Sequence, residues 1–128
     1  MNTPNICKSF VAASTITEFA VVALDSNGKV ALATDATSDL IVGVAQRGAS
    51  AGDVVDVIVH GETRAIAGAA LTFSSTPRLT VGAAGVLVDG STSGDFPVAR
   101  VLPNVNQTST SASGEQIVVL FHGPVTAN

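Results

Sequence analysis

The feature that most constrains this chain is a ten-residue stretch that occurs twice. Residues 52–61 read Gly-Asp-Val-Val-Asp-Val-Ile-Val-His-Gly, and residues 114–123 read Gly-Glu-Gln-Ile-Val-Val-Leu-Phe-His-Gly. Both copies open on a glycine and an acid, continue with β-branched and other apolar residues, and close on His-Gly, at a constant offset of 62 residues. Such runs are typical of largely buried β-strands. The two stretches therefore predict equivalent strands in a duplicated β unit.

The duplication extends to most of the chain. Asn27-Gly28, a strong hairpin signal, has a counterpart in Gly85, which stands 57 residues later. At the same offset, three further segments correspond: 78–81 with 21–24, 86–88 with 29–31, and 98–102 with 41–45. The later offset of 62 predicts five inserted residues in the polar loop 103–113. The pseudo-repeats predicted in this way span about residues 18–67 and 73–125.

Short strands separated by Gly, Ser, Thr and Asp turns, without a sustained 3.6-residue period, favour an all-β fold. We expect a small β-barrel or β-sandwich built from the two pseudo-repeated units. The chain has 128 residues, enough for one compact domain over residues 18–128. Gly43, inside a predicted strand, indicates a bulge or a close backbone approach. The predicted core includes Val57, Val59, Val119 and Phe121.

The first 17 residues show no regular period and contain Pro4 with several serines and threonines. We expect an extended N-terminal arm that ends in a short strand near residues 10–12. Arms of this kind are ordered by partners, for example by adding a strand to a neighbour's sheet.

Composition narrows the classes of function. Charged residues make up 12% of the chain, against about 25% in ordinary globular domains, so copies of the chain or a larger assembly are expected to cover part of the surface. The six basic residues are scattered, the net charge is −4, and Trp and Tyr are absent, which disfavours nucleic-acid binding. The apolar runs are too short for a membrane-spanning helix, and the first ten residues lack the apolar segment of a signal peptide. A single cysteine, Cys7, excludes an internal disulfide.

The two histidines are the most evident candidates for a metal site. A site between His60 and His122 would need a third ligand such as Asp56 or Glu62, and the usual ligand spacings are missing. The alternative is that both histidines end equivalent strands and cap the same turn in each repeat. We therefore expect no metal and no cofactor.

Other chemical motifs also fail. Asp25, Asn27 and Gly28 resemble the start of a calcium loop, but Val30 stands where that loop needs glycine and Ala36 where it needs glutamate, so a hairpin turn is predicted instead. Asp53, Asp56 and Glu115 are interpreted as strand-edge or interface charges. The chain has no Gly-x-Ser-x-Gly motif, no Walker loop and no nucleophile–base set. We therefore expect no enzymatic activity.

Three apolar segments carry a resemblance to a family. They are Leu-Ile-Val-Gly-Val-Ala at 40–45, Ala-Gly-Asp-Val-Val-Asp-Val at 51–57, and Leu-Thr-Val-Gly-Ala-Ala-Gly-Val-Leu-Val at 79–88. Together with the N-terminal arm they resemble the decoration, or cement, proteins of tailed-phage capsids, over about residues 18–123. The resemblance implies a β-barrel-like subunit, often trimeric, that sits at three-fold positions on the head and bridges major capsid subunits. The loop 103–113 has no counterpart in this pattern.

The resemblance implies a virion protein on the capsid exterior, made in the host cytoplasm, whose partners are the major capsid protein and its own copies in a homotrimer. The arm would dock on the capsid, and deleting residues 1–17 would abolish binding while leaving the fold intact. The candidate capsid contacts are Asn5, Ile6, Lys8, Phe10 and Val11. The candidate contacts in the loop are Asn104, Asn106 and Gln107.

Two other classes of protein fit the sequence. One is another virion β module, such as the base of a head fibre or a tail-associated part, which would bind in fewer copies. The other is a carbohydrate-binding β-sandwich, which the lack of Trp and Tyr disfavours because sugar faces usually stack on aromatic rings.

Overall fold

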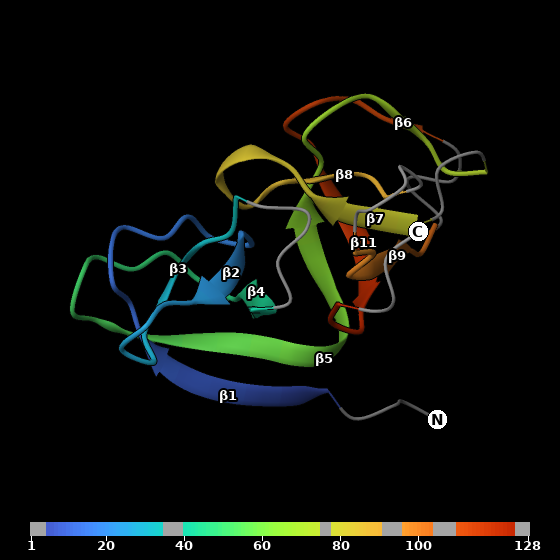
Figure 1. Cartoon of the computed structure of the whole chain (residues 1–128). Helices are drawn as coiled ribbons and strands as arrows, with labels where there is room; N and C mark the ends of the chain where they lie inside the picture. The colour runs from blue at the N-terminus through green and yellow to red at the C-terminus, as the bar shows by residue number, and fades with distance from the viewer. Residues whose placement is uncertain (1–4, 35–39, 75–77, 91–95, 104–109, 125–128) are drawn as a thin grey trace.

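The computed structural model describes residues 5–34, 40–74, 78–90, 96–103 and 110–124 (Figure 1). Its elements are β1 (Ile6–Val11), β2 (Val21–Leu24), β3 (Val30–Leu32), β4 (Ile41–Ala45), β5 (Val54–Ile66), β6 (Leu71–Thr72), β7 (Arg78–Val81), the 3₁₀ turn η1 (Ala83–Gly85), β8 (Leu87–Asp89), β9 (Ala99–Val101), β10 (Thr110–Ser111) and β11 (Gln116–Phe121).

Within the described residues, nine strands form one curled antiparallel sheet. Its order is β3-β2-β4-β5-β11-β9-β7-β8, with β1 also paired to β5, and β6 and β10 form a separate two-stranded ribbon. Figure 1 shows β5 as the long strand that runs beneath the first half of the chain and then turns upward into the second half. The all-β prediction is confirmed.

The strand order contains the same arrangement twice. The set β3-β2-β4 joins the first part of β5 in one half, and the set β8-β7-β9 joins β11 in the other. The strand that opens each half also corresponds, because β1 pairs with the first part of β5 as the second part of β5 pairs with β11. The register shows this directly: Val11 lies opposite Val54, and Ile66 lies opposite Gln116. We therefore define unit 1 as residues 6–60 and unit 2 as residues 61–122.

This division differs from the predicted repeats, which began near residues 18 and 73. Strand β5 carries the last strand of unit 1 directly into the first strand of unit 2, and the two meet at Gly61, whose φ is +135°. Because no loop separates the units, the sequence offers no turn signal at the boundary. The first strand of unit 2 was therefore assigned to the end of unit 1.

The register also moves one predicted correspondence by one residue. In unit 1, Val21 of β2 lies opposite Val44 of β4, and in unit 2, Arg78 of β7 lies opposite Arg100 of β9. Val44 thus corresponds to Arg100, whereas the sequence alignment had matched it with Val101. A shift of one residue moves a strand side chain to the opposite face of the sheet.

The N-terminal segment belongs to the fold. The predicted strand near residues 10–12 is longer, and it pairs along β5 of its own chain. Beyond it, Ala12 and Ile16 are only 1% and 2% exposed, and the backbone N–H of Ile16 donates to the Ala49 carbonyl at 2.8 Å. The expectation of an arm that only a partner orders is therefore wrong for this segment, because its apolar side chains complete a core inside unit 1.

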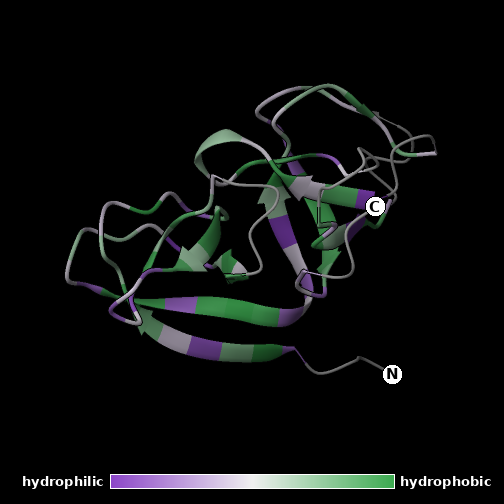
Figure 2. Cartoon of the chain, viewed as in Figure 1, coloured by the Kyte–Doolittle hydropathy of each residue, from purple (hydrophilic) through white to green (hydrophobic). Residues whose placement is uncertain are grey.

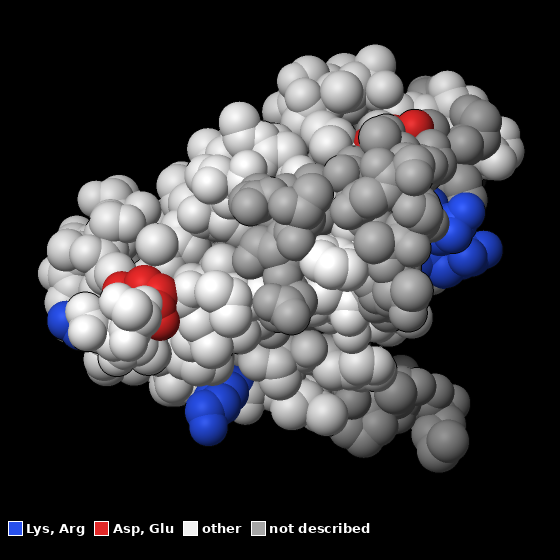
Figure 3. Space-filling model, in the orientation of Figure 1, with Lys and Arg blue, Asp and Glu red and all other residues white. Residues whose placement is uncertain are grey.

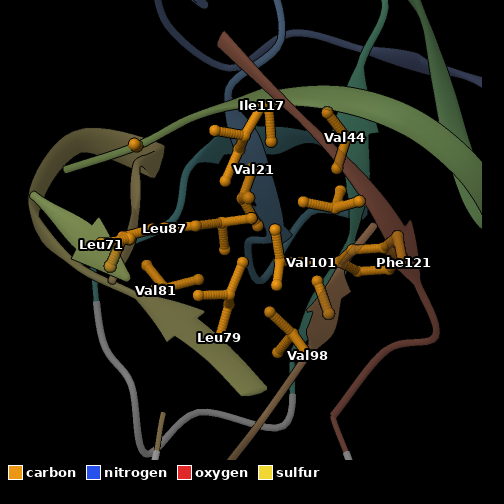
Figure 4. Close-up of a cluster of buried hydrophobic side chains, with 14 of the residues drawn as sticks. Val21, Val44, Leu71, Leu79, Val81, Leu87, Val98, Val101, Ile117 and Phe121 are labelled. Carbon is orange, nitrogen blue, oxygen red and sulfur yellow. The ribbon is translucent and has the colours of Figure 1, made fainter. Parts of the chain in front are cut away.

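Two hydrophobic clusters hold the sheet together. The unit 1 core consists of Ala12, Ile16, Val22, Val30, Ala45, Val55 and Val57. The main core lies mostly in unit 2, but Val21 and Val44 of unit 1 also enter it, where they meet side chains such as Ile117 and Phe121 (Figure 4). The two units therefore share one core and stabilise each other.

The four predicted core residues are distributed between these clusters. Val57 lies in the unit 1 core, and Val119 and Phe121 lie in the main core, all fully buried. Val59 is half-buried and packs against the unit 1 core. It stands where the register between β1 and β5 shifts, so it escapes the regular alternation of the strand.

Two local predictions are confirmed. The Asp25 carboxylate closes the β2–β3 turn by accepting from the backbone N–H groups of Asn27 at 2.8 Å and Lys29 at 2.9 Å, and Gly28 has a φ of +76°. At Gly43, a Cβ atom would lie 2.3 Å from the carbonyl oxygen of Ile58. That close approach requires glycine.

Candidate interaction surfaces

Strand β1 carries the predicted capsid contacts. Ile6 and Val11 are 57% and 37% exposed, and Lys8 is also exposed. Phe10 differs because it is half-buried and packs against the unit 1 core. Figure 2 shows that β1 mixes hydrophilic and hydrophobic residues. The strand therefore presents a mixed surface.

An apolar pair stands out on the outer face of β1 and β5. Val11 lies directly opposite Val54, which is 51% exposed. Next to them, the Ser9 hydroxyl donates to the Asp56 carboxylate at 2.9 Å. Side chains in such directly opposed pairs lie close together. The outer face thus combines exposed apolar area with a polar rim, a composition typical of docking surfaces.

The far edge of β1 is open among the described residues. The backbone N–H of Ala12 donates to the Asp53 carbonyl, so in an antiparallel ladder Lys8 and Phe10 also direct their backbone groups toward β5. The backbone groups of Cys7, Ser9 and Val11 then point away from β5, and within the described chain β1 pairs with β5 alone. An edge of this kind can accept an added strand.

Asn5 has a contact within its own chain. Its amide nitrogen donates to the Glu62 carbonyl at 2.8 Å, and its amide oxygen accepts from the Glu62 backbone N–H at 3.1 Å. The space is available because residue 61 is glycine, and a Cβ atom there would overlap the Asn5 side chain. Asn5 therefore fastens the start of β1 to the first strand of unit 2.

Replacing Asn5 with alanine should lower the free energy of unfolding by about 1–2 kcal/mol, because two hydrogen bonds to the backbone are lost. Asn5→Asp keeps the acceptor and removes the donor, so it should cost less than Asn5→Ala. Urea unfolding of the three proteins checks this. An Asn5→Ala protein as stable as the wild type would show that the contact does not stabilise the fold.

The other predicted contacts, Asn104, Asn106 and Gln107, lie outside the described residues.

The histidines occupy different positions in the two units. His60 is exposed within β5, opposite Ile6, because the strand continues through Gly61. His122 follows the end of β11, and its Nδ1 lies 2.8 Å from the Gly123 carbonyl oxygen. The interpretation that both histidines end a strand therefore holds for His122 and is wrong for His60. The described residues contain no group of three or more His, Cys, Asp or Glu side chains that could hold a metal ion.

The carboxylates that the sequence singled out have structural partners. Asp53 accepts from the backbone N–H of Ser50 at 3.1 Å, and Glu115 accepts from that of Ala112 at 2.7 Å. These bonds occupy equivalent positions in the two repeats and close equivalent turns. Asp53 and Glu115 thus belong to the repeated architecture.

An open depression of about 340 Å³ lies at the junction of the units, lined by Phe19, Gln46, Glu62, Thr63, Arg64 and Val118. Inside it, the Gln46 amide donates to the Thr63 hydroxyl at 2.9 Å and to the Val44 carbonyl at 3.0 Å. Phe19 has a φ of +63°, an unusual conformation for a bulky residue. These polar groups are engaged with each other, and they hold the end of β4 against β5.

Among the described helical segments, none is long and apolar enough to span a membrane.

Comparison with known proteins assigns a fold. Neither a family model nor a curated protein matches the sequence. Among solved structures, the chain is similar to the crystal structure of the head fiber gp8.5 N base of bacteriophage phi29. The TM-score is 0.67 at 15% sequence identity, and the match covers 96% of this chain and 99% of that chain. The two proteins therefore share one fold from end to end.

Proposed function

We propose that this chain is a structural protein of a phage head and binds to the outside of the capsid. The observation that carries the proposal is the fold, because a module from a phage head fibre has the same architecture over 99% of its own length. The low charged fraction of 12% is consistent with a surface covered by an assembly. The proposed role is structural and includes no catalytic step.

We propose the major capsid protein as the partner, and a homotrimer as the form that binds. In this role each copy bridges neighbouring capsid subunits and cements them. Many such contacts on one lattice add up to strong retention through multivalency. The second candidate is the base of a head fibre, which the likeness to the phi29 fibre base favours.

The test is co-sedimentation of the purified protein with heads of its source phage that lack it, with bound copies counted at saturation. Occupancy of the whole lattice would support the cement role, and occupancy of a small subset of sites would support the fibre base. Absence of binding would overturn both.

The paired valines of the outer face provide a finer prediction. Val54→Asp should raise the concentration for half-saturation of heads about tenfold or more, because a carboxylate would be desolvated in an apolar contact. Leu40→Asp is the matched control, since Leu40 is 53% exposed but lies beside β4, away from this face. Equal binding by Val54→Asp and the wild type would exclude this face as the docking surface.

A further inference from the structure

The internal repeat allows the same row of the sheet to be compared in the two units. In unit 1 the row crosses four strands through Val21, Val44, Ile58 and Cys7. Val21 and Val44 are fully buried and Ile58 is 7% exposed. Because Val21 and Val44 belong to the main core, this row is the face that unit 1 presents to unit 2.

In unit 2 the equivalent row consists of Arg78, Arg100, Leu120 and Glu62. Its charged members are exposed, and Leu120 is half-buried. Two arginines therefore lie directly opposite each other where unit 1 has two buried valines. Like charges in that position are destabilising, and they attract an acidic partner. Figure 3 shows basic atoms gathered at the edge of the molecule that carries β7 in Figure 1.

The contact between the units also uses a turn. The η1 turn of unit 2 sits on unit 1: the backbone N–H of Gly85 donates to the Ala33 carbonyl at 2.7 Å. A Cβ atom on Gly85 would lie 2.8 Å from the carbonyl oxygen of Val21. The contact thus joins a turn of one unit to a different face of the other, which makes it heterologous.

Unit 1 has the equivalent turn without an occupant among the described residues. Gly28 corresponds to Gly85 and has nearly the same φ, +76° against +79°. No atom lies within 4 Å of the position of its Cβ, and Ser26 and Asn27 beside it are exposed. Both halves of the contact are therefore present a second time: a turn on unit 1 and a sheet face on unit 2.

The charges of the two surfaces are complementary. Unit 1 contains six acidic and three basic residues, whereas unit 2 contains four and three. The β2–β3 turn includes the carboxylate of Asp25, and the row of unit 2 includes the two guanidinium groups. A polar version of the contact between units is what an association between folded copies requires, since such interfaces are less apolar than a shared core.

We propose that copies of this chain associate head to tail, with the β2–β3 turn of one copy, Asp25–Gly28, docked on the Arg78–Arg100 row of the next. A heterologous contact closes into a ring when its rotation permits, and the trimer proposed above is one such ring. The partner is a second copy of the chain, so the contact is measured without phage heads. Its failure is thereby separate from failure of the proposed function.

The first experiment compares charge reversals by sedimentation velocity of the purified chain. Wild type should form oligomers at concentrations up to about 100 μM, and Arg100→Glu should raise their dissociation constant at least about tenfold. Lys8→Glu changes the net charge by the same two units on β1, away from the row, and should leave the constant within about twofold. A monomeric wild type, or equal effects of the two substitutions, would overturn the proposal.

The second experiment tests the turn. Gly28→Asn keeps the positive φ, which asparagine tolerates, and adds a side chain where the neighbouring copy would lie, so it should weaken association at least about tenfold. Gly114→Asn is the control, because Gly114 also has a positive φ of +88° and open space around its Cβ position. Circular dichroism confirms that both variants fold. Weakening by Gly114→Asn alone, or by neither, would contradict a contact at the β2–β3 turn.

Discussion

Replacing Phe121 with alanine is expected to lower the free energy of unfolding by about 3–5 kcal/mol. Phe121 is fully buried in the main core, at the end of β11. Its ring lies among side chains of β4, β9 and β11 (Figure 4), so a cavity there would loosen the packing of both units. Urea unfolding measures the loss, and the midpoint should fall while the m-value stays the same.

The control for this change is Val54→Ala. Val54 is 51% exposed, and its truncation should change stability by less than about 0.5 kcal/mol. If Phe121→Ala cost less than about 1 kcal/mol, Phe121 would not be part of the core that joins the two units.

Deleting residues 1–17 should destabilise the fold itself, in contrast to the expectation from sequence. The deletion removes β1 and exposes the β5 edge, and it takes Ala12 and Ile16 out of the unit 1 core. Truncating Ile16 alone to alanine should cost about 2–5 kcal/mol, and the deletion should cost more. Circular dichroism and urea unfolding of both proteins check this.

Ser14→Ala is the matched control for Ile16→Ala, because Ser14 is exposed two residues away and its loss should change stability by less than about 0.5 kcal/mol. A deletion protein that unfolds at the wild-type urea concentration would return the N-terminal segment to the status of an independent arm. The deletion also complicates any test of capsid docking, because lost binding would follow from lost structure. Point substitutions on the outer face, such as Val54→Asp, avoid this problem.

Local chemistry was predictable wherever a short segment determines its own conformation. The Asn27-Gly28 hairpin needs a positive φ that glycine supplies, and Gly43 was singled out because only glycine permits a close approach. The apolar runs of β5 and β11 announced buried strands. These features specified the all-β class and much of the duplication.

One further signal of the duplication was present but weak. Residues 10–17 read Phe-Val-Ala-Ala-Ser-Thr-Ile-Thr, and residues 65–72 read Ala-Ile-Ala-Gly-Ala-Ala-Leu-Thr, at an offset of 55. The register of β1 and β5 shows that these segments are equivalent. Because their offset differs from 57 and 62, an alignment with one fixed spacing misses them, and residues 1–17 were therefore interpreted as an arm.

The sequence by itself determined the strands, the turns and the existence of a repeat, because these follow from side-chain periodicity and backbone conformations within a few residues. Only the tertiary structure decided that β1 pairs within its own chain, that β5 serves both units, and that Val44 corresponds to Arg100. The physical reason is that strand pairing is chosen by burial across residues far apart in sequence, and a one-residue change of register reverses which side chains are buried. The buried valines of one unit and the exposed arginines of the other became comparable only when that register was known.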